Sequence, residues 1–251
     1  MLFNSYQFKR PSKLFGTQNA KTIKGEDLGY KTFILYMSPE KQNSMGKSIC
    51  PKATNGCKSA CLFTAGRGIF NRVKTGRLHK TEYFLRERDN FMYQMAIEIA
   101  EGIQRYGAEN IAVRLNGTSD IPYENIPVGN FKNIMDMFFD VQFYDYTKIA
   151  SRFDKPLPPN YHLTFSMAET IENKIDCFRL LDKGNNVAAV FNVKNENDLP
   201  KKYKGYKVIN GDQHDLTFKH KQPKGKKGVI IGLKAKGMAK KDTSGFVITD
   251  F

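Results

Sequence analysis

The sequence has no stretch that approaches the roughly 20 consecutive apolar residues of a membrane-spanning helix. Residues 1–16, MLFNSYQFKRPSKLFG, also lack the apolar core of a signal peptide. We therefore expect a cytoplasmic protein that does not contact a membrane. Because the cytoplasm is reducing, clustered cysteines there are expected to be metal ligands or catalytic groups rather than disulfides.

Several common functional motifs are also missing. The sequence shows no internal repeat and no low-complexity segment, and GLKAKG (232–237) lacks the spacing of a phosphate-binding loop. His79 and His162 have no recognisable companion serine or cysteine, so a hydrolase triad is unsupported. Nothing in the sequence indicates a P-loop nucleotidase or a triad hydrolase.

Acidic residues are few, and the formal net charge is +15. Between Leu199 and Lys241 there are thirteen lysines and only two acids, Asp212 and Asp215. A second basic run follows the clustered cysteines and contains Arg67, Arg72, Lys74, Arg77, His79 and Lys80. Such an excess fits either a solvated surface that keeps the protein soluble or a surface that binds a polyanion. The position of the second run favours a nucleotide or nucleic acid as the partner.

Short strand-like runs alternate with helical patterns along the chain. The predicted strands are 32–38, 111–116, 141–146, 161–166, 187–193, 206–211 and 228–233. The predicted helices are 81–106, 131–139 and 170–181. Strands separated by helices imply crossover connections and a mainly parallel sheet.

The expected fold is therefore α/β, as a partial (β/α) barrel, with an open doubly wound sheet as the alternative. We expect one domain over residues 1–251. It consists of an N-terminal extension (1–30) and a partial barrel (31–246) that carries a cysteine loop at 45–65.

A ligand site in such a fold lies beyond the carboxyl ends of the strands, where polar residues gather in this sequence. The residues expected to line it are Arg114, Asn116, Ser119, Asp120, Asp145, Lys148, Ser166 and Asp212. Arg114 and Lys148 suit a carboxylate or phosphate, whereas Asp120 and Asp212 suit an amine or ribose hydroxyls. A hard cation would instead use Asp120, Asp145, Asp212, His214 and Asp215, although turn and cap chemistry explains these residues too.

Cys50, Cys57 and Cys61 fall within twelve residues, although the chain has only four cysteines. Thiolates favour iron–sulfur clusters, zinc and copper(I). Three thiols without an obvious fourth suit a cubane 4Fe-4S cluster with one open iron, while zinc needs a further ligand such as His79. Cys177 stands among apolar residues of a predicted helix and is expected to pack in the core. The sequence thus predicts a metal centre, with an iron–sulfur cluster favoured over zinc.

A strand, a three-cysteine loop and then parallel strands resemble a radical S-adenosylmethionine enzyme core. More specifically, ICPKATNGCKSACL, RLNGTSDI, FYDYTK, LTFS and GLKAKG are similar to the phage gene-product-88 domain family, over residues 30–246. The cysteine spacing here is C-x6-C-x3-C, whereas the radical enzymes usually have C-x3-C-x2-C. A phage origin would place the protein in the host cytoplasm.

The resemblance implies that the open iron binds S-adenosylmethionine and that an electron donor is a partner. The cofactor would then contact Arg114, Asn116, Gly117, Ser119, Asp120 and Ser166. The catalytic candidates are Asp120, Asp145, Lys148 and Asp212.

Three functions remain open from the sequence. The first is a radical-type iron–sulfur enzyme that acts on a nucleotide or nucleic acid. The second is a basic nucleic-acid-binding protein or nuclease with a structural metal centre. The third is a non-catalytic interaction protein that keeps a degenerate barrel, against which the polar strand ends argue.

Overall fold

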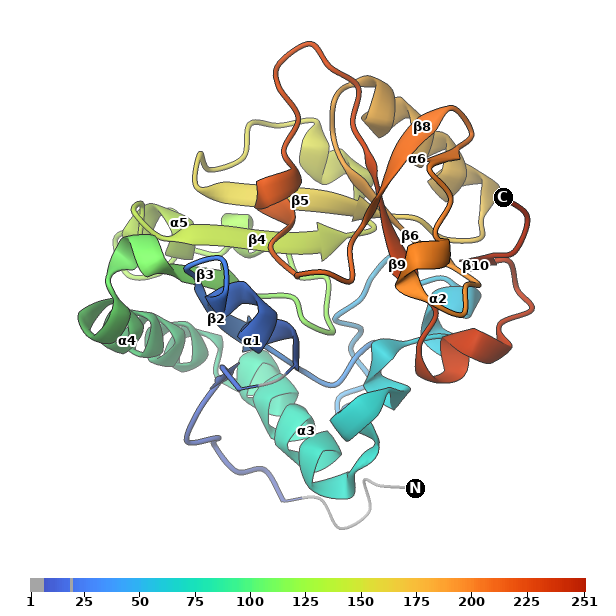
Figure 1. Ribbon diagram of the computed structural model, residues 1–251. Helices are drawn as coiled ribbons and strands as arrows, with labels where there is room; N and C mark the ends of the chain where they lie inside the picture. The colour runs from blue at the N-terminus through green and yellow to red at the C-terminus, as the bar shows by residue number, and fades with distance from the viewer. Residues whose placement is uncertain (1–6, 19) are drawn as a thin grey trace. The chain divides into compact units, whose positions relative to one another are not determined.

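The computed structural model describes residues 7–18 and 20–251 (Figure 1). The chain divides into two compact units. Unit 1 comprises Met1–Pro51, Arg67–Phe143 and Pro156–Tyr161. Unit 2 comprises Lys52–Gly66, Tyr144–Lys155 and His162–Phe251. The single domain expected from the sequence stays a prediction. No helix in the described ranges is long and apolar enough to cross a membrane.

Ten strands and six α-helices lie within the described part of the chain. The strands are β1 (Phe15–Gly16), β2 (Lys31–Leu35), β3 (Ile111–Arg114), β4 (Gln142–Thr147), β5 (Tyr161–Ser166), β6 (Val187–Phe191), β7 (Lys202–Tyr203), β8 (Tyr206–Asn210), β9 (Ile230–Lys234) and β10 (Val247–Ile248). The helices are α1 (Ala20–Glu26), α2 (Asn55–Ser59), α3 (Asn71–Arg86), α4 (Arg88–Tyr106), α5 (Ile134–Met137) and α6 (Ile171–Asp182).

The strands pair mainly in parallel. In unit 1 the order is β1-β2-β3-β4, with only β1 antiparallel to its neighbour. In unit 2, to which the end of β4 belongs, the order continues as β4-β5-β6-β9-β8-β7. There β10 pairs in parallel with β6, and β7 is antiparallel to β8. The predicted mixed α/β fold with a mainly parallel sheet is confirmed. The strand order does not close on itself among the described residues, so the partial barrel stays a prediction.

All seven predicted strands are present, some of them shorter than expected. The pattern missed β1, β7 and β10, each of which has two residues. Two residues are too few to show an alternation of apolar and polar side chains. β1 and α1 lie in the stretch that the sequence assigned to an N-terminal extension, and Phe15 of β1 pairs with Leu35 of β2.

The single helix predicted over 81–106 is wrong, because α3 and α4 meet at a break at Glu87, where φ is −137° and ψ is 57°. The Phe91 ring lies 5.3 Å from the Phe84 ring and 5.5 Å from the Tyr83 ring. Residues seven apart in a continuous helix are separated by about 10 Å along its axis. The break therefore folds Phe91 back onto the last turn of α3, which a continuous helix would prevent.

The helix predicted over 131–139 is shorter than expected. It begins after Asn133, whose side chain accepts a hydrogen bond from the Asp136 N–H at 2.9 Å, and it ends at Met137. A short bridge between Val128 and Phe131 occupies the start of the predicted range. The third predicted helix is confirmed as α6, which Thr170 caps.

The core of unit 1 packs α4 against the sheet. Phe33 of β2 is buried, and its ring lies against Phe15 and Tyr106. A Cβ at Gly102 of α4 would lie 2.7 Å from the Phe33 ring, so glycine allows this close approach of helix and ring.

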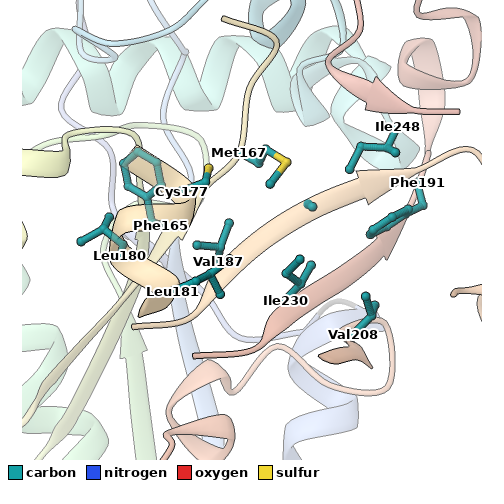
Figure 2. Close-up of a cluster of buried hydrophobic side chains, with 11 residues drawn as sticks. Phe165, Met167, Cys177, Leu180, Leu181, Val187, Phe191, Val208, Ile230 and Ile248 are labelled. Carbon is teal, nitrogen blue, oxygen red and sulfur yellow. The ribbon is translucent and has the colours of Figure 1, made fainter. Parts of the chain in front are cut away.

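The core of unit 2 forms between α6 and strands β5, β6, β8, β9 and β10 (Figure 2). Cys177 of α6 is fully buried in it, as the sequence predicted. Burial raises the pKa of the Cys177 thiol to about 12 and so favours the neutral form.

Candidate metal and ligand site

Cys50 lies in unit 1, beside the loop that follows β3. Its Sγ accepts a hydrogen bond from the Glu40 N–H at 3.4 Å and lies 3.7 Å from the carbonyl oxygen of Thr118. Ile49, the residue before Cys50, is also tied to that loop, because the Asp120 N–H donates to the Ile49 carbonyl at 2.9 Å. The loops after the parallel strands β2 and β3 therefore meet, as expected for carboxyl ends on one edge of a sheet.

The loop after β3 is held by close backbone contacts. The Gly117 N–H donates to the Leu35 carbonyl, and a Cβ at Gly117 would lie 2.7 Å from that oxygen. The Thr118 hydroxyl donates to the Met37 carbonyl at 2.5 Å and accepts from the Met37 N–H at 3.1 Å. Gly117 is thus required for close packing, whatever its role toward a ligand.

Two other predicted ligand residues in this loop contact each other. Asn116 Oδ1 accepts hydrogen bonds from the Ser119 hydroxyl and the Ile121 N–H, both at 2.8 Å. The Asn116 amide donates to the Ile121 carbonyl at 3.0 Å. These bonds shape the loop from within. Arg114 at the end of β3 and Asp120 in the loop are both buried.

Cys57 and Cys61 lie in unit 2, on either side of the end of the short helix α2. Thr54 caps this helix by accepting the Cys57 N–H at 3.2 Å, and Cys61 directly follows Ala60, the residue that ends the helix after Ser59. Both thiols are partly exposed, as is Cys50. The structure therefore divides the predicted ligands between the two units, with one in unit 1 and two in unit 2.

Glu169, which the sequence analysis missed, holds α2 in place. Its carboxylate accepts hydrogen bonds from the Gly56 N–H at 2.8 Å and the Thr54 hydroxyl at 2.7 Å. A Cβ at Gly56 would lie 2.8 Å from Phe246 Cβ and 2.3 Å from Ser244 Oγ, so any other residue would force these neighbours to shift. The useful sequence signal was an acid three residues beyond the end of a predicted strand.

The pKa of Glu169 lies below its ordinary value. Burial by itself would raise this pKa, but the hydrogen bonds from Thr54 and Gly56 and the positive charge of Lys148 lower it. At neutral pH the residue is therefore a carboxylate, which is the form that can accept both hydrogen bonds.

Lys148 and Ser166, two predicted site residues from neighbouring strands of unit 2, contact each other. The Lys148 ammonium donates to Ser166 Oγ at 2.8 Å and lies 5.5 Å from the centre of the Phe246 ring. The side chain of Lys148 thus stands at the ends of β4 and β5, where the sequence placed it.

Residues 12–250 match a family model described as gene product 88. The chain belongs to the gene product 88 family. This match confirms the family resemblance inferred from the sequence motifs and extends it toward the N-terminus, past the start predicted at residue 30. The matched range contains the cysteine loop, Glu169 and the stretch from Leu199 to Lys241, which we call the lysine-rich segment. No curated protein and no solved structure matches the chain.

Asp212, another residue in the family-matched range, joins the loops after β8 and β9. Its carboxylate pairs with the Lys236 ammonium and accepts the Lys234 N–H at 2.8 Å, while its own N–H donates to Asn210 Oδ1 at 2.9 Å. The side chain is almost fully buried, and its observed contacts serve the loop connections.

The other predicted cation ligands are placed separately. Asp120 belongs to unit 1, whereas Asp145, Asp212, His214 and Asp215 belong to unit 2. Asp145 is fully buried in β4, and Asp215 lies 3.4 Å from the Tyr144 hydroxyl. His79, considered as a fourth zinc ligand, lies in α3 of unit 1, where its Nδ1 accepts the Lys9 N–H. Within the described residues, no three His, Cys, Asp or Glu side chains form a group that could hold a metal ion.

Proposed function

We propose that this member of the gene product 88 family is an iron–sulfur protein that acts on a nucleotide or nucleic acid. Cys50, Cys57 and Cys61 would hold the cluster. The observation that carries this proposal is the different exposure of the four cysteines. The three that stand close together in the sequence are partly exposed, whereas Cys177 is fully buried.

Exposure matters because a cluster is held by thiolates, and thiolates form where a thiol is accessible and not desolvated. Cys177 fails on both counts, since burial raises its pKa to about 12. The donor set of the other three, all soft sulfur ligands, therefore fits an iron–sulfur cluster. Metal binding would order the three thiols around the cluster.

The finer proposal is a radical S-adenosylmethionine-type enzyme. A cluster held by three thiolates supplies one open iron for a small ligand, together with an electron from a donor protein. The contact between the loops after β2 and β3 supports this proposal, because Cys50 and Thr118 approach each other there. Arg114 and Asp120 are the candidate cofactor contacts on that side.

Within unit 2, Lys148 and Ser166 are the candidates for contact with the cofactor or substrate. They already share a hydrogen bond at the ends of β4 and β5. Asp145 and Asp212 remain catalytic candidates in the proposal, and a cytoplasmic location remains a prediction.

The test is anaerobic purification followed by iron, sulfide and zinc analysis. We expect about four irons and four sulfides per chain, with brown absorbance. Replacing Cys50, Cys57 or Cys61 with Ala should abolish the cluster, while the control Cys177→Ala should retain it. One zinc per chain without iron would refute the cluster. Titration calorimetry of the loaded protein with S-adenosylmethionine tests the finer proposal separately.

A second candidate is a nucleic-acid-binding protein or nuclease with a structural metal centre, zinc included. The charge of the lysine-rich segment favours it, because both acids between Leu199 and Lys241, Asp212 and Asp215, are buried. They place little negative charge on the surface to offset thirteen lysines. Binding of nucleic acid by a protein that contains zinc but no iron would support this candidate over the first.

A further inference from the structure

The lysine-rich segment begins with a tight hairpin in unit 2. β7 and β8 are antiparallel, with Tyr203 paired to Tyr206 and a two-residue turn at Lys204 and Gly205. Both turn residues have positive φ, 48° and 86°. This geometry fits a type I′ turn, in which asparagine or glycine is the usual first residue. Lysine is unusual in that position and adopts a backbone conformation that L-residues rarely favour.

One face of the hairpin is fixed to the core by its tyrosines. The Tyr203 ring contacts Phe191 edge-on at 5.7 Å, and Phe191 belongs to the core cluster of Figure 2. The Tyr206 ring stacks on Phe178 at 5.8 Å, and its hydroxyl donates to Asp182 at 2.9 Å. These contacts make the hairpin a rigid support.

The other face carries lysines opposite each other. Lys202 pairs directly with Lys207, and the backbone bond from the Val208 N–H to the Lys201 carbonyl makes this the non-hydrogen-bonded type of pair. Side chains are closest in such pairs, and like charges opposite each other destabilise a sheet. Both lysines are exposed, as is Lys204 at the tip. No acidic residue occurs between 201 and 210.

The opposed charges of Lys202 and Lys207 destabilise the hairpin, whereas the tyrosine contacts hold it in place. Binding of an external anion would relieve the repulsion between these lysines. We propose that the β7–β8 hairpin is a contact for the phosphate backbone of a nucleic acid, through Lys202, Lys204 and Lys207. This inference deepens the proposed function, because it rests on nucleic acid as the partner and names the element that binds it. It does not depend on which metal the cysteines hold.

Two features favour a phosphate backbone over a membrane surface or an acidic protein. The segment 199–241 has lysine but no arginine. Arginine pairs with carboxylates and bases through a planar fork of donors, whereas lysine binds phosphates as a point charge. No large hydrophobic side chain of the hairpin is strongly exposed, whereas membrane-surface segments insert such side chains.

The segment that precedes β9 contacts the hairpin from its tyrosine face. Lys227 lies 5.3 Å from the centre of the Tyr206 ring and pairs with Asp182 at 2.7 Å. Lys224 and Lys226 are exposed nearby in the sequence. Lys227 therefore lies on the tyrosine face of the hairpin, where Asp182 offsets its charge, and not beside Lys202 and Lys207.

The experiment compares full-length wild type with a triple variant, Lys202→Gln, Lys204→Gln and Lys207→Gln. The matched control is Lys132→Gln, Lys155→Gln and Lys174→Gln, which removes the same charge from three exposed lysines outside the hairpin. Affinities for labelled single-stranded and duplex DNA of mixed sequence are measured by fluorescence anisotropy over a range of salt concentrations. Vesicles that contain phosphatidylserine test the membrane alternative.

Each neutralised phosphate contributes about 0.7 to 0.9 to the slope of log affinity against log salt concentration. The hairpin variant should therefore lose about 2 to 3 from the wild-type slope, and its affinity at low salt should fall at least about tenfold. The control variant should keep most of the wild-type salt slope and most of the wild-type affinity at low salt. Equal losses in the two variants would overturn the inference, as would vesicle binding without DNA binding, or no wild-type binding to DNA at low salt.

Two further measurements separate this inference from other failures. Thermal unfolding should show the hairpin variant to be at least as stable as wild type, because the opposed charges are gone. A lower melting temperature together with weaker binding would mean that the lysines only support the fold, and would also overturn the inference. Iron and sulfide content, measured on the same samples, tests the cluster independently.

Discussion

Removing the Glu169 carboxylate should loosen α2, the short helix that contains Cys57 and precedes Cys61. Glu169 accepts hydrogen bonds from the Gly56 N–H and the Thr54 hydroxyl, and Thr54 in turn caps the Cys57 N–H. α2 has only five residues, and isolated helices of that length are unstable in water. Its order therefore depends on these contacts with the carboxylate.

The magnitude follows from the two bonds. A hydrogen bond to a charged group contributes about 1.5 to 3 kcal/mol. Because Glu169 is partly exposed, the lower value applies and water replaces part of the loss, which leaves about 2 kcal/mol for Glu169→Ala. That free energy corresponds to about a thirtyfold larger population of the locally open state, and so to about thirtyfold faster hydrogen exchange. Glu169→Gln keeps one acceptor oxygen for the Gly56 N–H, so its effect should be about fivefold, or 1 kcal/mol.

The assay is native-state hydrogen exchange of the amides of residues 54–60, read by NMR or mass spectrometry. Glu172→Ala is the matched control, because it removes an exposed carboxylate three residues later, on the first turn of α6. The control should change exchange in α2 by less than about twofold. Exchange in β6 reports whether unit 2 as a whole has been destabilised. If Glu169→Ala leaves exchange at Gly56 and Cys57 unchanged, the carboxylate does not hold α2.

Two further predictions concern stability. Gly102→Ala should destabilise the protein by about 1 to 3 kcal/mol, because the new methyl would lie 2.7 Å from the Phe33 ring. Gly76→Ala in α3, where a Cβ meets nothing within 4 Å, should stabilise the protein by up to about 1 kcal/mol. Denaturant titration measures the free energy of unfolding of both variants, and equal shifts would contradict the packing argument. His162 has a pKa lowered to about 4, chiefly by burial and also by Lys221 and His220, so it is neutral in the fold. The unfolded chain binds its proton near pH 6.5, so stability should fall by about 2 to 3 kcal/mol between pH 6.5 and pH 4, and His162→Phe should flatten that fall in a pH series of denaturant titrations.

The strands were predictable because each is a compact run of β-forming residues bounded by polar or glycine residues. The break at Glu87 was not, because apolar residues continue at helical spacing from Phe84 to Phe91 on both sides of it. What ends α3 is the packing of Phe91 on Tyr83 and Phe84, a tertiary contact that periodicity cannot register. The hairpin turn at Lys204 and Gly205 was also missed, because the strand β7 that precedes it has too few residues to show a strand pattern.

The strand-end rule located part of the candidate site. It placed Lys148 and Ser166 at the ends of neighbouring strands, where they share a hydrogen bond. Glu169 was missed because its partner Thr54 lies 115 residues away, and no local pattern links them. The division of the three clustered cysteines between two units was equally invisible, since proximity in sequence does not set which unit a residue belongs to.

The expectation that ligand residues follow the ends of strands also selects residues whose side chains hydrogen-bond the backbone of the loops. A chain that leaves a buried strand must satisfy its backbone groups, and the nearest polar side chains do so. Asn116, Ser119 and Asp212 are engaged in this way, so a ligand could recruit them only by breaking bonds that hold the loops. The exposed Lys202 and Lys207 of the hairpin carry no such cost. For Lys202 and Lys207 an anionic ligand would even relieve the repulsion between their like charges. On energetic grounds, these two lysines are therefore the residues from which a binding function is best sought.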